Sequence, residues 1–280
     1  MCFSAGMKIN SLSQLTLAVA IAAAGFLTAG CGTVPLTGRS QLNFIPEGQE
    51  MALGLSSFDS MKQSTPISKD AAANALVQKV GQRIAAVTGK DMPNAQWEFV
   101  VFESKEANAF CLPGGKVGVY TGILPITKDE AGLATVIGHE VAHAVAKHGA
   151  ERMSEGMVAQ YGGQLLGSAV STSDPRWQAL INGAYGIGAK GLVVLPHSRG
   201  QESEADHMGV VYMARAGYNP DAAVQFWQRF KDFKGERGSG ESSSLTDMLN
   251  KYSSTHPTDE VRIKQLQGWL PEAKAQFKAQ

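Results

Sequence analysis

Two histidines and a glutamate in one short segment have the types and spacing of a metal site. His139, Glu140 and His143 occur in the order H-E-x-x-H within a strongly helical stretch. Residues i and i+4 lie about 40° apart around a helix, so both imidazoles project from one face and can share one ion. Glu140 follows the first histidine directly and can reach a water on that ion. The alternative is a pair of solvated helix histidines.

A hydrolytic zinc site commonly takes three protein ligands and leaves one position open for water. Further along the chain, Glu202 and Asp206 lie four residues apart on one predicted helical face, whereas Glu204 points elsewhere. One group of this pair could bind the metal while its neighbour supports a ligand. By spacing alone the third ligand is Glu202, Asp206 or His207, and a simply solvated acidic face remains the alternative.

The elements that must position these side chains are mostly helices. Apolar residues at helical spacing predict helices over residues 47–61, 69–87, 129–145, 199–216 and 221–233, with a last helical pair after residue 257. Alternation predicts strands over 96–102 and 116–120, and residues 113–115 supply a turn between Phe110 and Val117. The strand 116–120 is interpreted as an edge strand that takes an extended substrate, or equally as a plain structural hairpin. The fold class is α+β and predominantly helical.

Two further segments are interpreted from composition. Residues 156–196 are rich in glycine and predict loosely packed helices that form a movable cover, and residues 235–244 predict a flexible loop. His148, beyond the motif, is interpreted as a solvated helix residue.

The N-terminus has the pattern of a sorting signal. A single positive charge at Lys8 precedes an apolar run over residues 15–27, which is shorter than a membrane-spanning helix requires. The small residues before Cys31 resemble the lipobox of bacterial lipoproteins. This predicts a lipoprotein signal peptide over residues 1–30, lipidation of Cys31 and a tether over residues 31–46. The alternative is an ordinary cleaved signal.

The charge balance excludes a basic binding module. The chain of 280 residues has 25 Lys and Arg against 25 Asp and Glu, so we expect no nucleic-acid partner. The same balance means that the lipid, and not net charge, must hold the chain on a membrane. Without the signal peptide only Cys31 and Cys111 remain, so no disulfide framework is expected.

The chain resembles the zinc peptidase family of the HtpX proteases and CAAX prenyl endopeptidases, with soluble members that include periplasmic lipoproteins resembling LoiP and BepA. The resemblance rests on the H-E-x-x-H motif, on Ser198 and Arg199 before Glu202 and Asp206, and on two further segments at residues 108–115 and 255–257. It spans about residues 40–270. It implies a gluzincin domain over residues 47–280, with a small β-sheet or hairpin beside the motif helix.

The resemblance also implies the roles of the site residues. His139, His143 and Glu202 would bind one Zn²⁺ per chain, Glu140 would act as general base, and Asp206 would accept a hydrogen bond from a ligand histidine. Cys111 stands where the family often has alanine, which makes a reactive thiol possible. His256 resembles the His-Pro of the family, and it could occupy the open zinc position as a latch or simply begin a helix.

The function expected from these features is a zinc endopeptidase, lipid-anchored in the periplasm and sorted to the outer membrane of a Gram-negative cell. Its substrates would be misfolded or unassembled envelope proteins, as the resemblance implies. One alternative is a chaperone or assembly factor that uses the same groove with little cleavage. Another is a zinc hydrolase for a non-peptide substrate, which would need a closed pocket.

Overall fold

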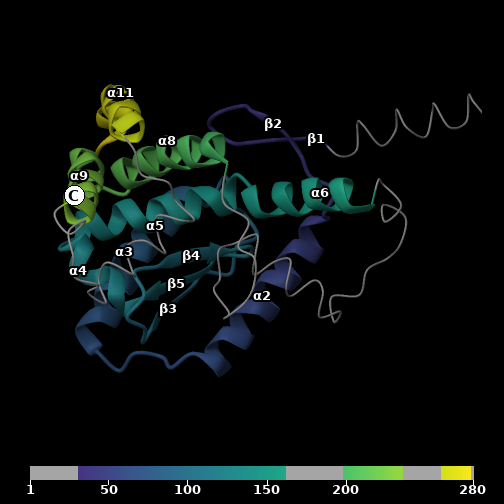
Figure 1. The fold of residues 1–280 in the computed structure, drawn as a ribbon, viewed down its shortest axis with the longest axis horizontal. Helices are drawn as coiled ribbons and strands as arrows, with labels where there is room; N and C mark the ends of the chain where they lie inside the picture. The colour runs from purple at the N-terminus through teal and green to yellow at the C-terminus, as the bar shows by residue number, and fades with distance from the viewer. Residues whose placement is uncertain (1–30, 162–197, 236–259, 279–280) are drawn as a thin grey trace, which may run out of the picture.

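The computed structural model of the chain describes residues 31–161, 198–235 and 260–278 (Figure 1). Among these residues, no helix combines the length and apolarity that crossing a membrane requires. The predicted signal peptide, most of the predicted cover, the 235–244 loop apart from its first residue, and His256 lie outside the described residues.

The described helices are α2 (Glu47–Ser64), α3 (Ala71–Thr88), a 3-10 turn (Thr121–Ile123), α4 (Leu124–Thr127), α5 (Glu130–Val145), α6 (His148–Tyr161), α8 (Arg199–Arg215), α9 (Asp221–Gly235) and α11 (Glu260–Gln276). The strands are β1 (Cys31–Thr33), β2 (Ser40–Leu42), β3 (Glu98–Phe102), β4 (Ala109–Leu112) and β5 (Lys116–Tyr120). The predicted class, α+β with a helical majority, is confirmed.

The larger sheet has the strand order β3-β5-β4. β5 runs parallel to β3, with Glu98 opposite Lys116, and antiparallel to β4, with Leu112 opposite Lys116. The tight turn between β4 and β5 uses Gly114 and Gly115 at φ of 81° and 79°, which glycine adopts without steric cost. The prediction that residues 116–120 form an edge strand is wrong, because β5 is the middle strand and both its edges are paired. β3 and β4 are the edge strands.

Side chains alternate between the two faces of this sheet. On β4, Ala109 and Cys111 belong to the main core with α3 and α5, whereas Phe110 and Leu112 pack in a second cluster with Phe58 of α2. Phe58, Phe102, Phe110 and Tyr120 form edge-on and stacked aromatic contacts in that second cluster. The sheet is therefore covered on both faces.

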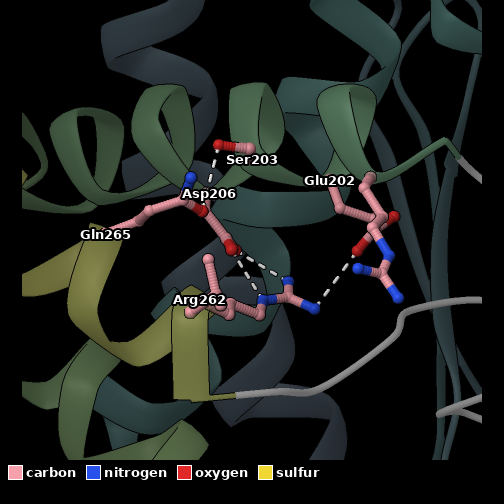
Figure 2. A pocket seen from close by; sticks show the side chains of 7 residues that line it. Glu202, Ser203, Asp206, Arg262 and Gln265 are labelled. Carbon is pink, nitrogen blue, oxygen red and sulfur yellow. Dashed lines mark hydrogen bonds and ion pairs between the residues drawn. The ribbon is translucent and has the colours of Figure 1, made fainter.

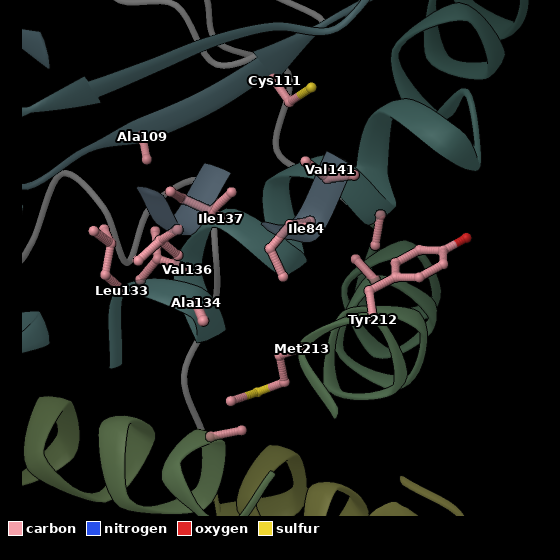
Figure 3. Packing of buried hydrophobic residues seen from close by; sticks show 14 of the residues in the cluster. Ile84, Ala109, Cys111, Leu133, Ala134, Val136, Ile137, Val141, Tyr212 and Met213 are labelled. Carbon is pink, nitrogen blue, oxygen red and sulfur yellow. The ribbon is translucent and has the colours of Figure 1, made fainter. Parts of the chain in front are cut away.

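α5 is the central helix, and every residue from Gly132 to Val145 is buried. It begins as predicted at Asp129, whose side chain accepts a hydrogen bond from Gly132 N at 2.8 Å. α5 packs against the sheet, α3 and α8, and Figure 3 shows apolar side chains of these elements gathered in one cluster. A helix buried on all sides fixes its side chains, so the motif histidines have little freedom to move.

α8 begins at a capping box, in which Ser198 Oγ accepts from Gln201 N at 3.1 Å and Gln201 Oε1 accepts from Ser198 N at 3.4 Å. This cap fixes the first turn, on which Glu202 stands. Figure 1 shows α8 lying along α5 on the side away from the sheet.

Candidate metal centre

The structure brings together the three predicted ligands on two helices. His143 Nε2 lies 3.0 Å from His139 Nε2, both on α5. The Glu202 carboxylate of α8 lies 3.4 Å from His139 Nε2 through Oε2 and 3.2 Å from His143 Nε2 through Oε1. All three side chains are buried, and their ligand atoms lie within 4.8 Å of one another. The alternative of solvated helix histidines is therefore wrong.

The other two candidates for the third ligand lie outside this cluster. His207 turns away from it, with its Nε2 2.7 Å from Glu272 Oε2 and its ring stacked on Trp269. Asp206 is next to the cluster but binds the outer nitrogen of a histidine, His139 Nδ1, at 3.0 Å. This contact has the geometry that the predicted supporting role requires, because a carboxylate that accepts from Nδ1 turns Nε2 toward a metal.

Arg262 of α11 is a site residue that the sequence did not indicate. Its side chain is buried, with Nε 2.6 Å from Asp206 Oδ2, Nη2 2.7 Å from Asp206 Oδ1 and Nη1 3.2 Å from Glu202 Oε2. Figure 2 shows its guanidinium between these two carboxylates. A buried arginine that bridges two acids offsets their charge and fixes their positions. No helical pattern distinguishes it from the exposed arginines and lysines, so the sequence carries no signal for it.

Glu140 lies between the two histidines in the sequence, and its side chain is buried on α5. It lies close enough to Cys111 of the edge strand β4 for its charge to act on that thiol. Cys111 itself is buried, and burial followed by the Glu140 charge raises the pKa of its thiol well above the usual value. The expectation of a reactive thiol is therefore wrong, since the thiolate is the reactive form.

His148 differs from prediction, whereas Glu204, as predicted, points away from the face that Glu202 and Asp206 share. His148 is fully buried, with Nδ1 2.8 Å from His143 Nδ1 and Nε2 2.9 Å from Glu204 Oε2. Two residues, Ala146 and Lys147, separate α5 from α6, and Lys147 breaks the helix with a φ of +53°, so the first residue of α6 lies beside the end of α5. The predicted solvated helix residue is thus part of the site's surroundings.

The electrostatic environments of the two motif histidines are different. Burial opposes protonation of His139, but the Glu202 charge and the Asp206 hydrogen bond outweigh it and raise the pKa to about 9. Burial lowers the pKa of His143 well below its usual value, and burial lowers that of His148 as well. His143 and His148 are therefore neutral at physiological pH, the form in which an imidazole binds a metal.

Part of the predicted tether has regular structure. β1 and β2 form an antiparallel hairpin in which Cys31 pairs with Leu42. Within this hairpin, Arg39 binds the Glu151 carboxylate through Nη1 at 2.6 Å and Nη2 at 2.9 Å, and Glu204 Oε2 through Nε at 2.7 Å. The mix of Pro, Thr, Gly and Ser that predicted a tether has turn character, and here the turns belong to a docked hairpin.

The residues present fit a zinc ion. Two imidazole nitrogens and one carboxylate are ligand types of hydrolytic zinc sites, and the outer nitrogen of each histidine has a hydrogen-bond partner. When bound, zinc would supply a Lewis acid and lower the pKa of a water toward about 7.

An H-E-x-x-H helix with a glutamate from a second helix, beside a small sheet, defines the gluzincin class of metal centre. The sequence matches the model of peptidase family M48 over residues 71–270, and the chain belongs to that family. It is 37% identical over 198 residues to the mitochondrial metalloendopeptidase OMA1 of Schizosaccharomyces pombe, covering 71% of this chain and 53% of that protein.

Two other relatives come from different organisms. Identity is 30% over 254 residues to the mitochondrial metalloendopeptidase OMA1 of Saccharomyces cerevisiae, covering 85% of this chain and 69% of that protein. It is 28% over 190 residues to the beta-barrel assembly-enhancing protease of Yersinia pestis, covering 66% of this chain and 38% of that protein. The chain thus spans about half the length of the Schizosaccharomyces pombe relative, about two thirds of the Saccharomyces cerevisiae one and less than half of the Yersinia pestis one.

Proposed function

We propose that the chain is a zinc-dependent endopeptidase. The observation that carries the proposal is the buried cluster of His139, His143 and Glu202, with Glu140 on the same helix as both histidines. Membership of a peptidase family and the metalloendopeptidase names of its relatives support the same activity.

Each residue has a defined task in this proposal. His139, His143 and Glu202 hold the ion, and Glu140 takes a proton from the attacking water and later delivers it to the leaving amine. Asp206 holds His139 in the tautomer whose Nε2 faces the ion. A substrate chain would lie beside β4, because β4 is the edge strand nearest α5 and extended peptides can pair with such an edge.

We further propose that the enzyme acts in the bacterial cell envelope, in the periplasmic lipoprotein branch of the family. The lipobox-like sequence ending at Cys31 supports lipid anchorage, and a glycine after Cys31 is compatible with sorting to the outer membrane. The name of the Yersinia relative refers to β-barrel assembly, and this is compatible with misfolded or unassembled envelope proteins as the substrates that we propose. Palmitate labelling that disappears in Cys31→Ser supports the anchor, and equal labelling of both proteins contradicts it.

The activity is tested by incubating an unfolded model protein with the chain and with Glu140→Gln, after the zinc content of both has been measured. We expect the unaltered chain to cleave and the variant to keep its zinc without cleaving, because the ligands remain while the base is lost. Equal cleavage by both would contradict the role of Glu140. Client binding without cleavage by either protein would instead support the chaperone alternative, and cleavage in His256→Ala would then indicate a latch.

A further inference from the structure

We propose that His148 and Glu204 fix the tautomer of His143, so that its Nε2 faces the metal, and that Arg39 of the N-terminal hairpin holds Glu204 in place. The inference rests on the proposed zinc site but not on the proteolytic activity. It assigns a positioning role to three residues outside the ligand set.

The direction of the hydrogen bonds follows from Glu204, the acceptor at the end of the series His143–His148–Glu204. Glu204 accepts from Thr37 Oγ1, from Arg39 Nε at 2.7 Å, and is 2.9 Å from His148 Nε2. With two donors already facing it, the group is a carboxylate, which only accepts. His148 Nε2 must therefore carry the hydrogen.

The positions of the remaining hydrogens, between His148 and His143, are then determined. A neutral His148 protonated at Nε2 has a lone pair at Nδ1, which lies 2.8 Å from His143 Nδ1. His143 Nδ1 must donate to it, which leaves a lone pair on His143 Nε2. That atom is the one grouped with His139 Nε2 and the Glu202 carboxylate.

The helix geometry explains why His143 needs an intermediate residue. Glu202 and Asp206 share one face of α8, and Asp206 reaches His139 directly. Glu204 lies about 200° around the helix from Glu202, on the opposite side, where it faces α6 and the hairpin. His148, at the start of α6, spans the space between this carboxylate and His143.

The hairpin completes the arrangement. Arg39 binds both Glu204 and Glu151, and Gln201 Nε2 donates to Glu151 Oε2 at 2.7 Å. The two acids are buried, so the arginine that pairs with them holds α6 and α8 together beside the metal centre. The N-terminal segment is thereby connected to a metal ligand through Glu204 and His148.

The first test compares the zinc affinities of His148→Phe and His148→Gln with that of the unaltered chain, by competition with a chelator. Phenylalanine keeps the ring but cannot accept from His143, so we expect affinity to fall about 10- to 100-fold. Glutamine can both accept and donate, and we expect it to restore part of the loss. The matched control is His207→Phe, which removes another imidazole–carboxylate pair on the solvent side and should leave the affinity unchanged.

Unchanged zinc affinity in His148→Phe would overturn the proposal. Arg39→Gln should weaken zinc binding less than His148→Phe, because Thr37 and His148 still face Glu204. Since substitution of the buried His148 can impair folding, the tautomers are also read in the unaltered, zinc-loaded chain by nitrogen-15 NMR of its histidines. We expect hydrogen on Nδ1 of His143 and on Nε2 of His148, and hydrogen on Nδ1 of His148 would refute the assignment. Zinc binding that depends on His148 in a chain without proteolysis would contradict only the proposed function.

Discussion

The guanidinium of Arg262 stacks on the ring of Trp227, with its central carbon 3.5 Å from the ring centroid. The same guanidinium binds Asp206 and Glu202, so α9 and α11 together place a positive charge against two acids of the candidate metal centre. A ring face stabilises a cation and restricts its position. The arginine therefore acts as a fixed counter-charge for the acids of α8.

Replacing Arg262 should destabilise the metal-free chain. In Arg262→Met, two buried carboxylates lose their shared cation, and breaking such a buried pair costs about 3–5 kcal/mol in the free energy of unfolding. Bound zinc would supply positive charge to Glu202, so we expect zinc to raise the melting temperature more in the variant than in the unaltered chain. Thermal unfolding with and without zinc measures both effects.

The control for Arg262→Met is Lys274→Met, on the same helix. Lys274 pairs with Asp221 at the surface, where an ion pair contributes little, so its loss should hardly change unfolding. Equal melting temperatures for the two variants without zinc would show that Arg262 is not the counter-charge.

The close crossing of α5 and α8 should depend on glycine at position 209. A Cβ there would lie 2.9 Å from the backbone nitrogen of His139, and backbone atoms cannot yield without moving a helix. In Gly209→Ala we expect the free energy of unfolding to fall by about 1–3 kcal/mol. We also expect weaker zinc binding, because Glu202 would be displaced from the histidines. Gly200→Ala on the same helix meets only Ser198 Oγ at 3.8 Å and serves as control. Tight zinc binding by Gly209→Ala would contradict this explanation.

Asp206→Ala should weaken zinc binding about 10- to 100-fold, as expected for loss of the partner of a ligand histidine. The physical reason is the 3.0 Å contact with His139 Nδ1, which fixes the tautomer and ring orientation of His139. Chelator competition measures the change. Glu272→Ala removes a carboxylate bound to His207 outside the site and should have no effect. Normal zinc retention in Asp206→Ala would refute the assignment.

The sequence predicts those parts of the site that depend on local spacing. His139 and His143 share one turn of helix, and Glu202 and Asp206 share another, so their common faces follow from helical periodicity. The third ligand required the family resemblance, since spacing left three candidates. The structure supplies the distances that separate Glu202 from Asp206 and His207.

The parts that spacing could not predict depend on contacts between distant residues. Arg39 and Glu204 are 165 residues apart, and Arg262 and Asp206 are 56 apart. Likewise, β3 pairs in parallel with β5, although β4 lies between them in the sequence. Strand order is not encoded in the alternation of any one strand. His148 was misinterpreted because its burial depends on the break between α5 and α6 at Lys147, a non-glycine residue in the left-handed region.

Cys111 should be inert in the folded chain and should make stability fall at alkaline pH. Burial raises the pKa of its thiol, so the unfolded chain loses this proton first, above a pH of about 8.5. The contribution of this thiol to the free energy of unfolding is therefore fully present below that pH and falls by about 1.4 kcal/mol per pH unit above it. The test uses a chain with serine at Cys2 and Cys31, beside the same chain carrying Cys111→Ala. We expect slow alkylation when folded, fast alkylation in guanidinium chloride, and a shallower alkaline loss of stability with alanine. Fast alkylation of the folded chain would show that Cys111 is accessible.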